Sequence, residues 1–318
     1  MSDQLERAVS AAFPSQTIDT IDEKQTRPGN ETGFMTFVDA EPAYVKTATD
    51  STRRLARETA VTRYANVHCP FQSPRVVAAN PDGDTPYLAT EPMSGGPLSD
   101  PWTDRDDRTE LLRQVGFAIA GVHETRFERS GVIIGGDADE LELMADTWSE
   151  TLCETIEWRA EDWFSDRFED VPRRLVETVR AVEPKIDGGT ATLLHGDCSR
   201  SNIHLDPNGL LDWERALVGD PAFDLTDAVG HLIDQVDVPE EERDALMNAL
   251  YDGYRERSGS LPDGIDRYRP LYWAIAYLLV PQTFDEWAPT VDQPIDELAE
   301  GVREEFDTRL SHTCEKLT

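Results

Sequence analysis

The most constraining feature of this chain is a dense run of polar residues between positions 193 and 225, LLHGDCSRSNIHLDPNGLLDWERALVGDPAFDL. Short apolar runs at 191–194, 203–205 and 210–211 break the helical periodicity of the neighbouring sequence, and the turn DPNG separates the last two. Short apolar runs joined by a turn that contains Pro and Gly are typical of a β-hairpin. We therefore predict a small hairpin set within a mainly helical part of the chain.

Three oxygen-bearing side chains lie at characteristic positions around the predicted hairpin. Asn202 follows Asp197 by five residues, and Asp212 follows Asp197 by fifteen. A path of loop, strand, turn and strand returns Asp212 to the neighbourhood of Asn202. Carboxylate and amide oxygens are the hard ligands that Mg²⁺ prefers, and a carboxylate beside them can serve as a general base. The spacing therefore indicates a magnesium site with a candidate base next to it.

The order of these residues resembles the catalytic and metal-binding segments of the protein-kinase-like fold. Five short elements are similar, more closely, to the aminoglycoside phosphotransferase family, which includes choline-kinase-like and other small-molecule kinases. In chain order these elements are His195-Gly196-Asp197, Asn202, Asp212-Trp213-Glu214, Gly219-Asp220-Pro221 and Asp224-Leu225. Five elements in order are a specific signal, whereas an HGD triplet alone would be weak. The resemblance extends over about residues 25–290 of the 318.

The resemblance implies an α+β chain with the protein-kinase-like two-lobed fold. Its N-lobe, residues 1–92, would hold a small antiparallel β-sheet and one helix. Its C-lobe, residues 93–318, would be mainly helical around the catalytic β-hairpin. A chain of 318 residues is long enough for two lobes. The loop-forming segment SGGPLSD, 94–100, separates a part rich in strand signals from a part with helical periodicity.

Local patterns predict the individual elements. In the N-terminal part, β-branched and aromatic residues predict two strands within 34–47 around a turn at 39–42, and two more at 74–79 and 86–90. A helix is predicted to begin at Ser51, which can cap it, and to end at 68. Beyond residue 100, apolar residues at helical spacing predict helices over 110–124, most of 139–183, 240–257, 267–280 and 295–315.

Two charged residues of the N-terminal part match the family's phosphate-binding pair. Lys46, in YVKT, falls where the family's strand lysine lies, and Glu58, in RETAV, matches the helix acid that pairs with it. An ammonium aimed at nucleotide phosphates needs an acid to hold its side chain in place. The alternatives are a surface strand residue for Lys46 and a solvated helix face for Glu58. We favour the functional interpretation because only four of the 30 Lys and Arg residues are Lys.

Other parts of the predicted nucleotide site carry weaker signals. The segment RPGNETGF occupies the position of the nucleotide-covering loop, where Gly29 and Gly33 would let backbone amides approach phosphates. It is no GxGxxG, and a plain turn explains it equally well. Thr90-Glu91-Pro92-Met93 falls where the family's hinge between the lobes binds the adenine base of the nucleotide. Because Pro92 has no amide hydrogen, the Glu91 carbonyl and the Met93 amide are the expected backbone pair.

The resemblance also implies roles for the polar run. Asp197 would be the catalytic base for an acceptor hydroxyl, and Asn202 and Asp212 would hold Mg²⁺ against the nucleotide phosphates. His195 would brace the loop and Asp224 would anchor it from a following helix. Two residues stay open: Glu214 either assists metal or water or is a solvated acid, and Cys198 is a small filler residue or a reactive thiol.

The acceptor is expected to be a small molecule. Gly196 stands where many protein kinases have an Arg that pairs with a phosphorylated activation loop, and seven residues between Asp212 and Asp220 leave no room for a peptide platform. Aminoglycosides, amino sugars, amino alcohols and similar metabolites all remain candidates. The acceptor pocket would contain aromatic residues that either stack on the substrate or simply pack between helices. They are Trp148, Trp158, Trp163 and those of Tyr268–Trp287.

The balance of charge excludes several partners. The chain has 30 Lys and Arg against 63 Asp and Glu, a formal net charge of -33. Such a surface repels nucleic acid and anionic lipid. The many aromatic residues argue against disorder. An acidic, Lys-poor, foldable chain resembles proteins of salt-loving microbes, where molar salt shortens the Debye length to about 3 Å. We therefore interpret the acidity as an adaptation to salt and not as a ligand signal.

The remaining features indicate a cytoplasmic protein. The four Cys form no CxxC pair, so zinc and redox motifs are unsupported. The N-terminal MSDQLERAVSAAF lacks the basic residues of a signal peptide, and the longest apolar stretch, 271–281, is too short to span a membrane.

Taken with the resemblance, the sequence predicts a Mg²⁺-dependent kinase that transfers the γ-phosphoryl group of ATP or GTP to a small-molecule hydroxyl. No obligate protein partner is expected. The main alternative is a catalytically silent, pseudokinase-like module that binds a nucleotide. A nucleotidase or a kinase that acts on proteins comes third.

Overall fold

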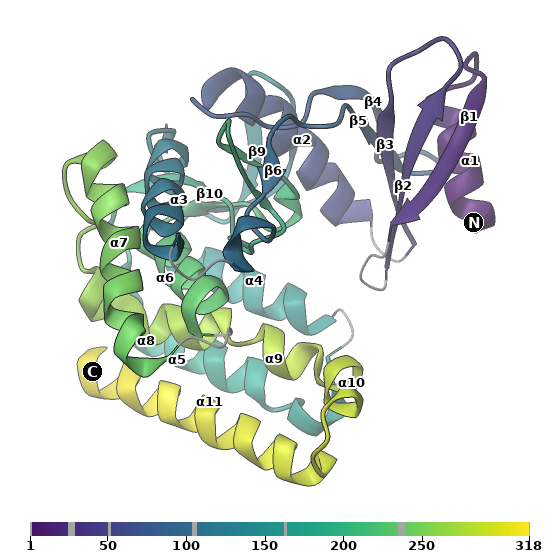
Figure 1. The fold of residues 1–318 in the computed structure, drawn as a ribbon. Coiled ribbons are helices and arrows are strands. Elements are labelled where there is room, and N and C mark those ends of the chain that lie inside the picture. The colour runs from purple at the N-terminus through teal and green to yellow at the C-terminus, as the bar shows by residue number, and fades with distance from the viewer. Residues whose placement is uncertain are drawn as a thin grey trace.

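An antiparallel sheet of five strands from residues 18–90, which we call the five-stranded sheet, lies at one end of the molecule (Figure 1). In the remainder, helices surround a second sheet of five shorter strands and a third sheet of three strands. The computed structural model describes residues 2–24, 29–49, 52–103, 107–161, 164–234 and 239–317. The chain starts beside the five-stranded sheet and finishes on a long helix on the opposite side of the molecule (Figure 1).

The five-stranded sheet has the order β1-β2-β3-β5-β4, and all neighbouring strands are antiparallel. The strands are β1 (Ile18–Lys24), β2 (Asn30–Phe37), β3 (Ala43–Ala48), β4 (Val76–Asn80) and β5 (Tyr87–Thr90). Helix α1 (Asp3–Ala12) covers one face, where Leu5 joins Met35 and Val45 in a buried cluster. Because side chains alternate along β3, Tyr44 and Lys46 point to the opposite face.

Helix α2 (Thr52–His68) connects this sheet to the rest of the chain. It contacts β3, β4 and β5 of the sheet, and it also contacts β8 and the short helix η3 (Trp213–Arg215) of the C-terminal part. A second sheet has the order β7-β10-β13-β8-β9. Its strands are β7 (Arg126–Phe127), β8 (Gly131–Gly136), β9 (Leu141–Met144), β10 (Ala191–Leu194) and β13 (Leu217–Gly219).

A third, small sheet carries the polar run. Its order is β12-β11-β6, formed by β6 (Gly96–Pro97), β11 (Ile203–Leu205) and β12 (Gly209–Leu210). Ile203 pairs with Leu210 and His204 pairs with Gly209, which confirms the predicted hairpin. The run 191–194 is also a strand, but it pairs with β13 and β7 in the second sheet.

Helices make up most of the C-terminal part, and α3 lies along α7 while α8 lies along α11 (Figure 1). The α-helices are α3 (Arg108–Val122), α4 (Trp148–Glu161), α5 (Val171–Ile186), α6 (Ala222–Val229), α7 (Glu240–Ser258), α8 (Ile265–Ala276), α9 (Leu279–Gln282), α10 (Phe284–Trp287) and α11 (Ile295–Leu317). Shorter turns are η1 (Pro101–Thr103), η2 (Asp166–Phe168), the π-helical η4 (Gly230–Asp234) and η5 (Ala288–Thr290). None of the described helices is both long and apolar enough to cross a membrane.

Most predicted elements are confirmed, and the differences have local causes. The segment 139–183 is helical in α4 and α5, but its first residues form β9, because Leu141 and Leu143 alternate with Glu140 and Glu142. The predicted loop 94–100 contains the two-residue strand β6. Elements α1 and β1 were not predicted. The expected cap Ser51 lies outside the described residues.

Candidate functional site

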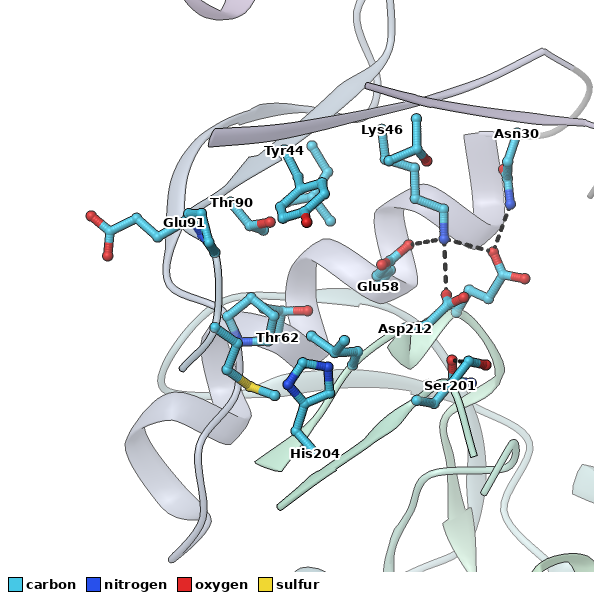
Figure 2. Close-up of a pocket in the computed structure, with 18 residues that line it drawn as sticks. Asn30, Tyr44, Lys46, Glu58, Thr62, Thr90, Glu91, Ser201, His204 and Asp212 are labelled. Carbon is cyan, nitrogen blue, oxygen red and sulfur yellow. Dashed lines mark hydrogen bonds and ion pairs between the residues drawn. The ribbon is translucent and has the colours of Figure 1, made fainter. Parts of the chain in front are cut away.

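A cavity of about 430 Å³ lies between the five-stranded sheet, α2 and the β11–β12 hairpin (Figure 2). Its lining comes from segments that are far apart in the sequence. The lining residues are Asn30, Thr32, Tyr44, Lys46, Glu58, Thr62, Pro74, Leu88, Thr90, Glu91, Pro92, Met93, Ser201, Asn202, His204, Leu211, Asp212 and Glu214. Lys46, Glu58 and Asp212 lie together at one end, which we call the polar end, and Thr90 and Glu91 lie at the other (Figure 2). We call this second end the apolar end, because Pro92 and Met93 continue the same segment of the lining.

Lys46 is the central charge of the polar end. Its Nζ lies 2.7 Å from Glu58, 2.9 Å from Asp212 and 3.0 Å from Glu214 (Figure 2). Asn30 also donates from Nδ2 to Glu214, at 2.9 Å. The structure thus brings Lys46 and Glu58 together and adds two carboxylates from the C-terminal part of the chain.

The buried charges shift one another's pKa values. Burial alone would lower the pKa of Lys46, but Asp212, Glu214 and Glu58 raise it well above its usual value. Burial raises the pKa of Glu58 to about 7, against the attraction of Lys46. Burial also disfavours ionised Glu214, yet Lys46, Arg54 and Arg215 lower its pKa to about 2. Lys46 and Glu214 are therefore the firmly ionised pair of this cluster.

Asp212 and Asn202 meet because the hairpin closes directly beside them. The Leu211 amide donates to the Asn202 carbonyl at 2.8 Å, immediately before Asp212. Asp212 itself has a left-handed backbone, with φ of 62°, a conformation that Asp tolerates better than most residues. Asn202 donates from Nδ2 to the Asp197 carbonyl (3.1 Å), and its Oδ1 accepts from Ser201 (3.3 Å). These bonds fix the orientation of the amide.

The donor set at this end of the cavity is suited to a divalent cation. Carboxylate oxygens of Glu58, Asp212 and Glu214 all lie within 4.8 Å of one another. The Oδ1 of Asn202 adds an amide oxygen to the same lining. A set of hard oxygens without thiolate or imidazole fits Mg²⁺ by its chemistry.

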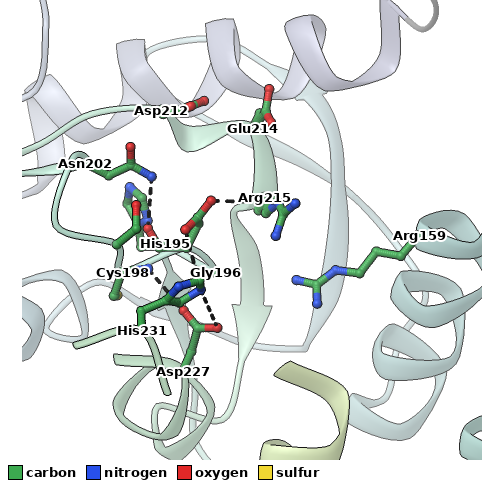
Figure 3. A network of polar contacts seen from close by, with 12 residues as sticks. Arg159, His195, Gly196, Cys198, Asn202, Asp212, Glu214, Arg215, Asp227 and His231 are labelled. Carbon is green, nitrogen blue, oxygen red and sulfur yellow. Dashed lines mark hydrogen bonds and ion pairs between the residues drawn. The ribbon is translucent and has the colours of Figure 1, made fainter. Parts of the chain in front are cut away.

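Asp197 is not among the described residues that line the cavity, and it is almost fully buried, with 3% of its surface exposed. Two basic side chains, Arg215 and His231, approach its carboxylate; both are labelled in Figure 3. Arg215 Nε is 3.9 Å from Oδ2, and His231 Nε2 is 3.6 Å from Oδ1. The carboxylate is thus held in a basic environment close to Asn202.

Helix α6 anchors the backbone of the loop that carries Asp197. Asp224 accepts from the amides of His195 (2.6 Å) and Gly196 (2.9 Å), and Asp227 accepts from the amide of Cys198 (3.0 Å). The His195 ring donates from Nε2 to the Leu211 carbonyl, at 2.8 Å, so this loop also holds the hairpin. Burial raises the pKa of the Cys198 thiol well above its usual value, as expected for a filler residue.

Gly196 is required by the shape of the loop. Its φ of +74° is left-handed, and a Cβ would lie 2.3 Å from the Arg215 carbonyl oxygen. Another side chain at this position would push the Asp197 loop away from η3.

The apolar end contains the segment that the sequence predicted to bind the nucleotide's purine base. Thr90, Glu91, Pro92 and Met93 line it, and the Glu91 carboxylate turns outward to Arg75. Gly29 and Gly33 are not in the described lining; their neighbours Asn30 and Thr32 are. Gly33 instead lies against Leu5 of α1, and Gly29 has a left-handed φ of +86°. The residues at 25–28 lie outside the described part of the chain.

The aromatic residues expected near the acceptor have different surroundings. Trp148 is buried, donates to the Tyr272 hydroxyl (2.8 Å) and packs edge-on against Phe223. Trp158 lies under the Arg57 guanidinium, 4.4 Å from it. Trp163 lies outside the described residues. Of the aromatic residues within 268–287, Trp273 and Tyr277 both stack against the Arg309 guanidinium. Packing between helices accounts for Trp148 without a ligand.

Sequence reasoning missed two residues that shape the polar end, Asn30 and Arg57, and left the role of Glu214 open. Asn30 binds Glu214 across 184 positions of sequence, and no local pattern marks that pairing. One alternative for Glu214 was a solvated acid, but only 4% of its surface is exposed. Arg57 is fully buried and donates to the carbonyls of Ile133 (2.7 Å) and Glu214 (3.0 Å). Its place beside Glu58 on α2 was the only signal available.

Solved structures share this fold at low sequence identity. The aminoglycoside phosphotransferase APH(4)-Ia superposes with a TM-score of 0.64 at 13% identity, over 98% of this chain and 99% of that one. A macrolide 2'-phosphotransferase from Brachybacterium faecium gives 0.57 at 16% identity, over 94% and 97% of the two chains. An aminoglycoside phosphotransferase solved with GDP and kanamycin gives 0.59 at 15% identity, over 96% and 99%. No curated protein matches the sequence.

These superpositions confirm the α+β, protein-kinase-like fold that the sequence predicted. A sequence comparison independently matches residues 30–271 to the model of the phosphotransferase enzyme family. That match covers well over half of the chain and contains both Lys46 and the whole polar run. The chain therefore belongs to the phosphotransferase enzyme family.

Proposed function

We propose that this protein transfers the γ-phosphoryl group of ATP or GTP to a hydroxyl group of a small molecule, with Mg²⁺ as cofactor. The observation that carries the proposal is Lys46, whose ammonium lies among Glu58, Asp212 and Glu214 at the polar end of a 430 Å³ cavity. A buried lysine surrounded by carboxylates is a ready site for a polyphosphate that arrives with its own metal ion.

Two structural neighbours were solved with a nucleotide, or an analogue of one, and a second small molecule. Thermostable mutants of APH(4)-Ia were determined with AMP-PNP and hygromycin B, and with ADP and hygromycin B. Another aminoglycoside phosphotransferase was determined with GDP and kanamycin. These structures contain adenine and guanine nucleotides respectively, so ATP and GTP are both candidate donors for the present chain.

The proposed lobes are residues 1–92 and 93–318, with the nucleotide in the cavity between them. Lys46, held by Glu58, would contact the phosphates, and Gly29, with Gly33 in the strand β2 that follows it, would belong to the segment that covers them. The Glu91 carbonyl and the Met93 amide would bind the base. This assignment agrees with the apolar lining around Thr90–Met93 and the charged lining at the opposite end.

Asn202 and Asp212 would hold Mg²⁺, which neutralises phosphate charge when bound. Asp197 would act as the base. The acceptor O–H proton passes to the Asp197 carboxylate as the acceptor oxygen bonds to the γ-phosphorus. The bond from that phosphorus to the bridging oxygen then breaks, and the nucleoside diphosphate leaves.

The acceptor is proposed to be small. Between Asp212 and Asp220 the chain forms only η3 and β13, and β13 pairs directly with β10 inside the second sheet. A peptide platform has no backbone available there. Aminoglycosides, amino sugars, amino alcohols and related metabolites remain the acceptor classes to test.

The test is transfer of a labelled γ-phosphoryl group in molar KCl with Mg²⁺. ATP and GTP are each offered with a pool of aminoglycosides, amino alcohols, sugars and cell metabolites, and Asp197→Asn is the matched control. We expect a labelled small molecule that is missing with the variant. Tight Mg²⁺-nucleotide binding without transfer would instead identify a pseudokinase-like binding module, and label in protein would identify a protein kinase.

A further inference from the structure

One histidine beside the proposed base has no role in the mechanism above. Three side chains on consecutive turns of α6 and η4 face the loop of Asp197: Asp224, Asp227 and His231. Asp224 and Asp227 bind backbone amides of that loop. His231 differs from both because its ring lies beside the Asp197 side chain itself.

The His231 ring lies between two carboxylates. Its Nε2 is 3.6 Å from Asp197 Oδ1 and 3.6 Å from Asp227 Oδ1. All three side chains are largely buried, with 11% of the His231 side chain and 4% of each Asp side chain exposed. Arg215 approaches Asp197 through its other oxygen, Oδ2. Each oxygen of the Asp197 carboxylate therefore has a basic group beside it.

The backbone around His231 is fixed at both ends. At its start, the Gly230 amide donates to the carbonyls of Thr226 and Asp227 of α6. At its end, Asp234 accepts from Trp273 of α8 (2.8 Å) and pairs with Arg243 of α7. A π-helical turn inserts an extra residue into a helix, and such turns occur frequently at functional sites. Here the turn aims the imidazole at the Asp197 loop.

We propose that His231 is a positioning residue for Asp197: it holds the carboxylate, together with Arg215, in the orientation needed to accept the acceptor's proton. This inference rests on the proposed function, in which Asp197 is the base. A buried carboxylate that loses a basic neighbour can rotate, and a displacement of about 1 Å at a catalytic group can cost about 100-fold in rate.

A second cavity makes the proposal testable by chemical rescue. His231 lines a cavity of about 230 Å³, together with Asp227, Asp234, Trp273, Tyr277, Glu305 and Arg309. Truncation of the ring would enlarge this cavity by the space of the imidazole, whose Nε2 lies 3.6 Å from Asp197. Free imidazole could then occupy the vacated place, whereas an unrelated loss of folding cannot be repaired in that way.

The experiment compares His231→Ala with His312→Ala, an exposed histidine of α11. For His231→Ala we expect kcat to fall about 10- to 100-fold, with the KM for nucleotide unchanged because His231 does not line the nucleotide cavity. Added imidazole should restore most of the lost kcat. His312→Ala should behave like the wild-type protein. His231→Gln, which keeps a polar N–H group near the Asp197 carboxylate, should lose less kcat than His231→Ala.

Two results would overturn the proposal: an unchanged kcat in His231→Ala, or a loss that neither imidazole nor the Gln variant reduces. The contact can also be tested without activity, from the NMR resonances of the His231 ring. They should move in Asp197→Asn and stay in place when the exposed Asp139 is changed to Asn. If the wild-type protein transfers no phosphoryl group, the proposed function fails, and the NMR result alone decides whether His231 holds Asp197.

Discussion

Asp197, the proposed base, is buried beside Arg215 and His231, and neither of these neighbours is in the described lining of the candidate nucleotide cavity. We expect Asp197→Asn to lower turnover at least about 100-fold, because an amide cannot accept the proton of the acceptor hydroxyl. Nucleotide affinity should stay close to the wild-type value, since Asp197 is not in the described lining of the cavity. Turnover and calorimetric nucleotide binding measured on the same sample check both parts. Wild-type turnover in this variant would remove Asp197 from the role of base.

Glu214 links the charge cluster to folding stability. Its pKa is about 2 in the folded protein, below the ordinary value of 4.5. A lowered carboxyl pKa stabilises the folded state above pH 4.5, and this contribution is lost as the pH falls toward 2. A shift of this size corresponds to about 3 kcal/mol.

We therefore expect Glu214→Gln to lower the free energy of unfolding by about 3 kcal/mol near pH 7. The difference from the wild-type protein should vanish near pH 2. Denaturant unfolding across this pH range measures it, and Glu304→Gln, an exposed acid of α11, is the matched control. A difference that does not change with pH would contradict the ionised state of Glu214.

At the scale of elements, two helices approach closely because each has a glycine at the contact. A Cβ on Gly116 of α3 would lie 1.9 Å from the Leu250 carbonyl oxygen, and one on Gly253 of α7 would lie 1.8 Å from the Arg113 carbonyl oxygen. Such distances do not occur between real atoms, so a side chain at either position would force the helices apart.

We expect Gly116→Ala to destabilise the protein by at least about 2 kcal/mol, because the overpacked contact is backbone and cannot rotate away. Gly301 of α11 is the matched control, since a Cβ added there would meet no neighbouring atom within 4 Å. Gly301→Ala should stabilise the protein by up to about 1 kcal/mol through helix propensity. Thermal and denaturant unfolding of the two variants compare these effects. Equal stabilities would show that the α3–α7 contact can relax.

The sequence predicted the elements whose signals are local. Periodic apolar residues identified α3, α7 and α11, and the turn DPNG identified the β11–β12 hairpin. Helix α1 and strand β9 also carried local signals that were not used. Leu5 and Val9 recur at helical spacing after the cap Ser2, and Leu141 and Leu143 alternate with charges.

The parts of the site that could not be predicted depend on long-range packing. Spacing and resemblance were enough to expect that Lys46 meets Glu58 and that Asn202 meets Asp212. By contrast, the burial of Glu214 follows from Asn30 and Arg57, which reach it from β2 and α2. The place of His231 depends on a π-helical turn, and no residue pattern in the sequence marks such a turn.

At the scale of the whole molecule, the surplus of acid is the dominant property. The net charge of -33 is spread over a chain whose ionised side chains lie mostly at the surface. Repulsion between surface charges extends over about 10 Å at 0.1 M salt and over only about 3 Å at 1 M. Salt should therefore stabilise the folded state, because the folded chain holds its acids closer together than the unfolded chain does.

We expect the thermal unfolding midpoint to rise steadily as KCl increases from about 0.1 M to about 1 M. A variant with three exposed loop acids neutralised, Asp39→Asn, Glu41→Gln and Asp292→Asn, should be more stable than the wild-type protein at low salt and should gain less from KCl. Sucrose is the control, because it is excluded from protein surfaces and stabilises proteins without screening charge. It should therefore raise the midpoints of both proteins equally, whereas KCl should raise that of the wild-type protein more. If KCl raised the two midpoints by the same amount, the acidity would not act through charge repulsion.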